Sequence, residues 1–425
     1  MINAKRYRMA GENMATIKPF KCIRPAKEYA KKTAALPYDV YNRKEACEAV
    51  KGNPYSFLNI DRAETQFDDS VDTYDDKVYA KAKELLDKMR NDGVYLKDAD
   101  ENYYIYELTM DGRSQTGLVA CASIDDYKNN VIKKHENTRA DKEADRIRHV
   151  DTCNAQTGPI FLAYRKNETV SLVIEKVKKT VPAYDFVSDD KIGHRVWVID
   201  NLEDKKTIYH EFCRIDDIYI ADGHHRAASA VKVGFKRREE KGNYTGDEEF
   251  NFFLSVLFPD EELMIMPYNR VVKDLNGRSK EAFLEEIRNR FDVEKKDAQV
   301  SPEKKGTFGM YLDNTWYLLT AKKELLSNDP VKGLDVSILQ DYLLDPVLGI
   351  KDPKTDKRID FVGGIRGLNE LEKRCSEDME IAFSMYATSI AELFAVADAG
   401  LLMPPKSTWF EPKLRSGIFI HELDK

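Results

Sequence analysis

The stretch "IYIADGHHRAASAVKVG", residues 218–234, joins a short apolar run to an alanine-rich segment through Asp222 and Gly223. The apolar run predicts a buried strand, and the alanines that follow Arg226 predict a helix. A glycine between the two permits a tight turn and a close approach of the main chain to a ligand. The sequence therefore predicts a strand that ends in a tight turn directly at the start of a helix.

The residues of this turn are suited to a negatively charged ligand. The first-turn amides of a helix and the helix dipole favour an anion. Arg226 adds a planar guanidinium, and His224 and His225 add further hydrogen-bond donors. A phosphate would repel Asp222 unless this carboxylate holds a metal ion or accepts a proton from an attacking hydroxyl. In the alternative interpretation Asp222 caps the helix, the histidines bond local carbonyls and Arg226 pairs with a surface acid.

A second polar cluster lies in "VIKKHENTRADKEADR", residues 131–146. Lys133 and His135 could neutralise phosphate charge there, and Glu136 could serve as a carboxylate base. The alternative is a solvated helix face with charges paired along the helix. The sequence contains neither GxxxxGK nor GxGxxG, so no P-loop and no dinucleotide fingerprint is indicated.

Composition limits the partners of the chain. A net charge of −7 over 425 residues gives no general attraction to nucleic acid or anionic lipid. No apolar run approaches ~18 residues, and the N-terminus lacks the apolar segment of a secretory signal. The six cysteines are scattered without a CxxC pair, as expected of reduced thiols. We therefore expect a cytoplasmic protein without nucleic-acid or membrane partners, and leave open whether it forms a homodimer.

The chain is long enough for two or three domains. Hairpins and helices that follow one another without regular strand–helix alternation favour a mixed α+β fold. We expect an N-terminal extension over residues 1–17, a core over 18–269 and a mainly helical α+β region over 270–425 that packs on the core. Within the core, "SFLNIDRAE", residues 56–64, is predicted to be a strand.

Two further stretches carry candidate substrate-binding residues. Tyr38 and Asp39 follow a proline in "LPYDVY"; in the alternative interpretation Tyr38 is packed and Asp39 caps the next helix. "PPKSTWFEPKLRSG", residues 404–417, is a loop between prolines and a glycine, and it either closes over an anionic site or straps the core. Its hydrogen-bond donors are Lys406, Ser407, Thr408, Lys413 and Arg415.

Six blocks of the chain resemble, in order, a bacterial and archaeal family catalogued as domain of unknown function 1015. The resemblance extends from about Lys18 to His421, and the family name carries no activity. The blocks are "KPFKCIRP", "PYDVYNRKEACEAVKGNPYSFLNIDRAE", "KKHENT", "ADGHHRAASA", "LFPDEELMIMPYNRVVKDLNG" and "MPPKSTWFEPKLRSGIFIH".

The block "ADGHHRAASA" is also similar to the phosphate-binding box of the ParB/sulfiredoxin-like fold, in the variant found in free serine kinases. Those enzymes phosphorylate the hydroxyl of L-serine to give O-phosphoserine. The resemblance implies a ParB/sulfiredoxin-like core with a large insertion, because the box of the compact kinases lies much closer to their N-terminal strand. "IKPFKCIRP" is similar to that N-terminal strand and adds Arg24 to the candidate substrate-binding residues.

The resemblance implies a role for each residue of the two polar clusters. Glu136, Asp222 and His224 would be catalytic, with Glu136 as the base and Asp222 beside the transferred group, where it could hold Mg²⁺. The donor phosphate would be bound by Gly223, His224, His225 and Arg226, with Lys133 and His135 nearby. The substrate-binding candidates are Arg24, Tyr38, Asp39, Lys406, Ser407 and Thr408.

The sequence thus predicts a small-molecule kinase that transfers a phosphoryl group to the hydroxyl of free L-serine. Positioned cations and a helix N-terminus would offset charge on the transferred group, and Mg²⁺ would bridge the phosphates. ATP, ADP and pyrophosphate all remain candidate donors. The alternative function is that of a nucleotide- or phosphate-binding regulator without catalysis.

Overall fold

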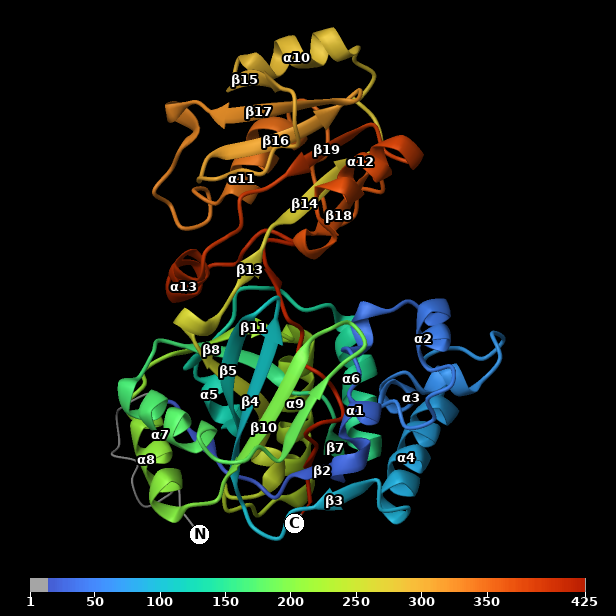
Figure 1. Cartoon of the computed structure of the whole chain (residues 1–425), viewed down its shortest axis with the longest axis vertical. Coiled ribbons are helices and arrows are strands. Elements are labelled where there is room, and N and C mark those ends of the chain that lie inside the picture. The colour runs from blue at the N-terminus through green and yellow to red at the C-terminus, as the bar shows by residue number, and fades with distance from the viewer. Residues whose placement is uncertain (1–13, 425) are drawn as a thin grey trace. The chain divides into compact units, whose positions relative to one another are not determined.

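The computed structural model describes residues 14–424 and divides the chain into two compact units (Figure 1). The first unit comprises Met1–Leu263 and Pro412–Lys425, and the second comprises Met264–Glu411. Residues 1–13 of the expected N-terminal extension lie outside the described residues. The chain thus changes unit a few residues before the expected boundary at 269/270, and its last segment returns to the first unit.

The first unit is built on a nine-stranded sheet in which the predicted strand before Gly223 is β11. The strand order is β6-β11-β8-β12-β5-β4-β10-β9, with β1 paired to β5. β11 is parallel to β6 and β12 is parallel to β8, while the other pairs are antiparallel. The strands are β1 (Ile17–Lys18), β4 (Tyr103–Met110), β5 (Arg113–Ser123), β6 (Ile132–Lys133), β8 (Ile160–Tyr164), β9 (Tyr184–Val187), β10 (Gly193–Ile199), β11 (Ile218–Asp222) and β12 (Phe252–Pro259).

Nine α-helices are assigned to the described part of the first unit, and four of them, α5, α7, α8 and α9, share an apolar core with the sheet. Among the others, α6 packs against both α9 and α4 (Figure 1). The helices are α1 (Ala30–Thr33), α2 (Arg43–Ala49), α3 (Leu58–Asp61), α4 (Asp76–Asn91), α5 (Ile124–Lys128), α6 (Ala140–Cys153), α7 (Glu168–Lys178), α8 (Leu202–Phe212) and α9 (His224–Lys241).

The prediction of a strand over residues 56–64 is wrong. This segment forms α3 and a 3-10 turn at Ala63–Gln66. Its apolar residues, Phe57, Leu58, Ile60 and Ala63, are all buried in a second apolar core beneath α4. A short apolar run that is buried on every side has the same sequence pattern in a strand and in a helix. In this segment the tertiary packing favours the helix.

The C-terminal segment Pro412–Lys425 is fixed to the first unit by backbone pairing and aromatic contacts. Ser416 and Ala35 exchange two main-chain hydrogen bonds of 2.9 and 3.1 Å. β21 (His421–Glu422) pairs with β7 (Ala155–Gln156). The ring of Phe419 lies against Tyr104 and Tyr106, at centroid distances of 5.7 and 5.6 Å. This part of residues 404–417 is therefore a strap across the first unit.

The second unit is not mainly helical, so that part of the prediction is wrong. A six-stranded antiparallel sheet in the order β15-β17-β16-β19-β14-β18 forms its centre. Within the region expected to be mainly helical, residues 377–400 contain strand β19 as well as a helix, because the buried run Ile381–Ser384 pairs with both neighbours in the sheet. The strands are β14 (Tyr268–Val272), β15 (Phe291–Lys296), β16 (Thr307–Leu312), β17 (Thr315–Ala321), β18 (Ile359–Gly363) and β19 (Ile381–Ser384).

Four α-helices and one small two-stranded sheet complete the described second unit. The helices are α10 (Lys280–Arg288), α11 (Asp335–Leu339), α12 (Leu368–Glu377) and α13 (Ile390–Asp398), and the small sheet pairs β13 (Ile265–Met266) with β20 (Trp409–Phe410). The overall mixture of sheets and helices confirms the predicted mixed α+β class. No helix within residues 14–424 has both the length and the apolar character needed to cross a membrane.

Candidate functional site

The turn between β11 and α9 has the form that the sequence predicted. Gly223 adopts a left-handed conformation with φ of 92°, and α9 begins at the next residue. No side chain among the described residues caps the start of α9. Asp222 therefore does not cap this helix, contrary to the alternative interpretation, and its Oδ1 accepts the Gly223 N–H at 2.9 Å. The first-turn N–H groups of α9 and the positive end of its dipole thus have no side-chain cap among the described residues.

The Asp222 carboxylate is held ionised by two cations. Its Oδ2 lies 3.1 Å from Nζ of Lys413, which comes from the C-terminal strap. Burial on its own would raise the pKa of Asp222, but the charges of Lys413 and Arg226 outweigh burial and hold this pKa well below its ordinary value. A third of the Asp222 side chain stays exposed, so the charge is accessible to a ligand.

Arg226 places its guanidinium directly over Gly223. A Cβ at position 223 would come within 3.1 Å of the Arg226 Nε and 3.2 Å of its Nη2. The Nη1 of Arg226 donates to the Pro159 carbonyl at 2.7 Å, which fixes the orientation of the planar group. Glycine is thus required at 223 both by the backbone conformation and by the close approach of this cation.

His224 and Glu136 form a second pair beside the turn. Burial lowers the pKa of His224 to about 4, so its ring is neutral at pH 7. Its Nε2 accepts the His135 N–H at 3.4 Å. A neutral ring that accepts at Nε2 carries its proton on Nδ1, and this atom lies 3.8 Å from Oε2 of Glu136. His224 therefore directs an N–H at a carboxylate that is itself partly exposed.

His135 and His225 flank this pair in different environments. The His135 ring is fully buried, edge-to-face with the His224 ring at 4.4 Å, and neither of its nitrogens has a partner among the described residues. Burial lowers the pKa of His135 to about 3. His225 is half-buried, and its Nδ1 accepts the Arg139 N–H at 3.4 Å. The histidines are thus neutral, and the positive charge of the site comes from Arg226 and Lys413.

The structure brings Glu136, His135 and Asp222–Arg226 together. The other predicted site residues bond different partners or lie in the second unit. Lys133 pairs with Asp217 at 3.0 Å. Arg24, in β2 (Ile23–Pro25), pairs with Asp98 at 2.8 Å and contacts neither the turn nor Glu136. Lys406, Ser407 and Thr408 belong to the second unit. The phosphate-binding role of Lys133 and the substrate-binding roles of Arg24, Lys406, Ser407 and Thr408 stay predictions.

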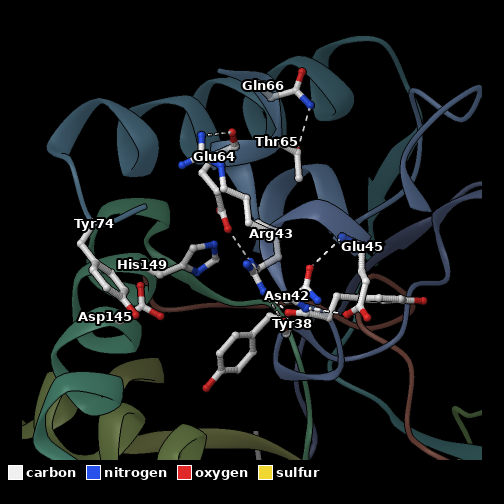
Figure 2. A network of polar contacts seen from close by, with 12 residues as sticks. Tyr38, Asn42, Arg43, Glu45, Glu64, Thr65, Gln66, Tyr74, Asp145 and His149 are labelled. Atoms are coloured by element: carbon white, nitrogen blue, oxygen red, sulfur yellow. Dashed lines mark hydrogen bonds and ion pairs between the residues drawn. The ribbon is translucent and has the colours of Figure 1, made fainter. Parts of the chain in front are cut away.

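A cavity of about 170 Å³ lies in the same unit, between the segment around Tyr38 and helices α3, α4 and α6. Figure 2 shows Asp145 and His149 extending from one helix toward the segment that carries Tyr38. Tyr38 and Asp39, both expected to bind substrate, line the cavity. The other polar residues of its wall are Tyr41, Asp61, Arg62, Glu64, Thr73, Tyr74, Tyr79, Lys142, Asp145, Arg146 and His149.

A smaller cavity of about 30 Å³, large enough for a water molecule, is lined by residues of this region and by Arg226 of the turn. Its wall includes Tyr38, Asp61, Arg146 and His149, which also line the larger cavity, and Arg226. The signal for the α6 residues that the sequence analysis missed was a polar stripe at helical spacing, Lys142, Asp145, Arg146 and His149. Such a stripe predicts a solvated face unless another element covers it.

The two charged pairs of this wall are each tightly made. Arg62 donates to Glu64 at 2.5 Å, and its Nη1 also donates to the Tyr38 carbonyl at 2.9 Å. Arg146 donates from Nε to Asp145 Oδ2 at 2.9 Å. Burial lowers the pKa of His149, and the charge of Arg146 adds to this effect, so the His149 ring is neutral.

The chain belongs to the family described as protein of unknown function, DUF1015, whose model matches residues 17–337. No curated protein matches the chain. Similar solved structures include a free serine kinase in complex with AMP, at 13% identity and a TM-score of 0.35 over 72% of this chain and 91% of that chain. SbnI with a C-terminal truncation, from Staphylococcus aureus, matches at 11% identity and a TM-score of 0.39, over 70% and 85%. A conserved hypothetical protein from Pyrococcus furiosus matches at 17% identity and a TM-score of 0.32, over 71% and 94%.

Proposed function

We propose that this protein is a small-molecule kinase that phosphorylates the hydroxyl of a free amino acid, with L-serine as the acceptor. The observation that carries the proposal is the uncapped start of α9, with the Arg226 guanidinium fixed over Gly223 and two carboxylates alongside. Main-chain donors and a planar cation suit phosphate oxygens, and a carboxylate beside them suits proton transfer from a hydroxyl. The likeness of this segment to the phosphate-binding box of free serine kinases supports the same activity.

In this proposal the donor phosphates lie against the first turn of α9 and Arg226. Glu136 accepts the proton of the acceptor hydroxyl, and the hydroxyl oxygen forms a bond to phosphorus. The bond from that phosphorus to the bridging oxygen of the donor breaks, and the leaving group keeps the electron pair. The N–H on Nδ1 of His224 faces Glu136 at 3.8 Å and would orient its carboxylate by charge, while Arg226 and Lys413 stabilise the charge on the phosphates.

Mg²⁺ fits this arrangement only together with the donor. Among residues 14–424, no three His, Cys, Asp or Glu side chains gather as a metal site. Mg²⁺ is commonly bound by one or two carboxylates plus substrate phosphates, and Asp222 offers one ionised carboxylate beside the phosphate position. When bound, the ion would neutralise charge on the donor phosphates.

The direct test is to incubate the purified protein with L-serine, Mg²⁺ and ATP, ADP or pyrophosphate in turn, and to detect O-phosphoserine by mass spectrometry. We expect product with at least one donor, and formation about 10²- to 10⁴-fold slower with that donor when Glu136→Gln replaces the wild type. Absence of product with every donor would overturn the proposal. Nucleotide binding without product would instead support a non-catalytic regulator. The uncapped start of α9 would be sufficient for such a protein to bind phosphate.

A further inference from the structure

Arg146 presents unused hydrogen-bond donors to the cavities beneath α6. Its side chain is nine-tenths buried. The Nε donates to Asp145, and the guanidinium lies 4.0 Å from the ring centroid of Tyr38. Neither terminal nitrogen has a hydrogen-bond partner among the described residues, and Arg146 lines both the larger and the smaller cavity. Because the rest of the side chain is buried while these nitrogens face the cavities, they are available to a ligand in this space.

Asp61 presents the complementary group to the same two cavities. The residue is 5% exposed, and its Oδ1 accepts the Thr157 hydroxyl at 2.9 Å. Its Oδ2 has no partner among residues 14–424. An ionised carboxylate in a buried position is normally paired with a cation or with several donors. One oxygen of Asp61 thus remains for a donor that enters the cavity.

The other charges of the wall narrow down the ligand. Arg62 with Glu64 and Arg146 with Asp145 form pairs that cancel, which leaves Asp39 and Asp61 as acids and Lys142 as a base. A phosphate or other dianion would meet too few cations here and two carboxylates. A small molecule with one carboxylate and one ammonium group meets a forked guanidinium and a free carboxylate oxygen.

We propose that this cavity binds the zwitterionic head of a free α-amino acid. The terminal nitrogens of Arg146 donate to the α-carboxylate, and Oδ2 of Asp61 accepts from the α-ammonium group. The volume of about 170 Å³ is below the ~300–1,000 Å³ of sites for drug-sized ligands, which favours a short side chain. That the bound amino acid is a phosphoryl acceptor rests on the proposed kinase function. Arg146 and Asp61 also line the smaller cavity, whose wall includes Arg226.

The binding test uses isothermal titration calorimetry on the full chain with four compounds. We expect L-serine and L-alanine to bind similarly, because the head and not the hydroxyl is recognised. N-acetyl-L-serine, which lacks the ammonium group, and L-serine methyl ester, which lacks the carboxylate, should each bind at least 10-fold more weakly. Equal binding of either blocked compound, or no binding of L-serine and L-alanine at millimolar concentration, would overturn the proposal.

Variants test the residues themselves. Arg146→Lys keeps the charge but loses the fork, and we expect a 10- to 100-fold loss of L-alanine affinity. The matched control is Arg214→Lys in the same unit, whose guanidinium is exposed and pairs with Glu211. Should circular dichroism show Arg146→Lys unfolded, Asp61→Asn and Ala82→Leu, which fills the cavity from α4, provide the same test. Unchanged L-alanine affinity in the folded variants would overturn the assignment.

L-Alanine separates the two proposals because it cannot be phosphorylated. Binding of L-alanine that depends on Arg146, without O-phosphoserine from any donor, would refute the kinase and leave the amino-acid site standing. O-Phosphoserine formation that is unchanged by Arg146→Lys would refute the site and leave the kinase standing.

Discussion

The turn after β11 and the cavity beneath α6 belong to one unit, but they are built in opposite ways. The turn consists of five consecutive residues, Asp222–Arg226, so its chemistry can be read from a single stretch of sequence. The cavity collects its polar wall from three helices and the segment around Tyr38, which are separated by many residues. A contiguous site can be recognised from its residues, whereas an assembled site needs the packing that brings its parts together.

The two regions also differ in electrostatics. At the turn, the helix start, Arg226 and Lys413 act together on an anion, with Asp222 as the counter-charge. In the cavity, acids and bases alternate and largely cancel, with unused groups on Arg146 and Asp61. The turn therefore suits a phosphate and the cavity suits a zwitterion. Substitutions in one region should leave ligand binding in the other unchanged, and this separation can be measured.

The largest expected effect is on turnover, where the two ligands meet. Glu136→Gln removes the proton acceptor but keeps the shape of the side chain. We expect kcat for O-phosphoserine formation to fall by about 10²- to 10⁴-fold, while donor and amino-acid affinities stay unchanged. The control Asp141→Asn alters an exposed acid of the same segment, paired with Arg139, and should retain full activity. A Glu136→Gln enzyme with wild-type kcat would assign the base to another group.

The fold of the turn could be predicted because local sequence preferences determine it and no long-range contact overrides them. A four-residue apolar run, a glycine and an alanine-rich segment specify strand, turn and helix, and all three are present. The residues 56–64 show the opposite case. These residues include Asp61 and were predicted to form a strand, whereas they form a helix that α4 and α6 bury. Asp61 could therefore not be placed on the cavity wall from the sequence.

Lys413 illustrates a second limit of sequence reasoning. Residues 404–417 were identified as a loop with donors that could reach an anionic site or strap the core. The structure places Lys413 on Asp222, 191 positions earlier in the chain. Only the pairing of the C-terminal strap with Ala35 and β7 brings these two side chains together, and such long-range pairing has no local signature.

The next prediction separates the two binding regions directly. Arg226→Ala removes the guanidinium over Gly223, and we expect donor affinity to fall about 10- to 100-fold, as for the loss of a charge-assisted hydrogen bond. L-Alanine affinity should remain at the wild-type level. Lys236→Gln, an exposed residue on the same helix, is the control. Calorimetric titrations with nucleotide and with L-alanine give both affinities, and a parallel loss of both would show that the regions form one site.

A smaller effect is expected from the ion pair that crosses the turn. Lys413→Met leaves Asp222 ionised in a half-buried position, so the free energy of unfolding at pH 7 should fall by about 1 kcal/mol. The pKa of Asp222 lies below its ordinary value in the folded protein, so the pair stabilises the fold above that ordinary value and loses its effect as the pH falls through the lowered one. The difference between variant and wild type should therefore shrink at the lowest pH values in urea titrations.

The control for this pair is Lys206→Met, which breaks an exposed ion pair with Glu203 within one helix. We expect it to change the free energy of unfolding less than Lys413→Met does. Equal effects of the two substitutions would mean that Lys413 contributes no more than a surface charge. Asp222 would then owe its ionisation to Arg226 alone.

The smallest change in the free energy of unfolding is expected from a substitution at His135. Comparing it with a substitution at His149 compares a buried histidine of the turn with one of the cavity. His135→Leu replaces a ring whose nitrogens have no partner within residues 14–424, so stability at pH 7 should be unchanged or slightly higher. His149→Leu in the cavity should instead cost about 1 kcal/mol, because Nε2 of His149 bonds the Ile60 carbonyl at 3.1 Å. Urea unfolding of both variants checks this difference.

The pH dependence of His135→Leu tests the same point a second way. The pKa of His135 is about 3 in the folded protein and near 6.5 in the unfolded chain, so the unfolded state binds more protons between these values. Wild-type stability should fall as the pH drops from about 6.5 toward 3, and His135→Leu should lose less over this interval. A variant that follows the wild-type curve would place the titrating group elsewhere. A loss of donor affinity in the Leu variant would assign the His135 nitrogens to the phosphate, since no group in the described part of the chain bonds them.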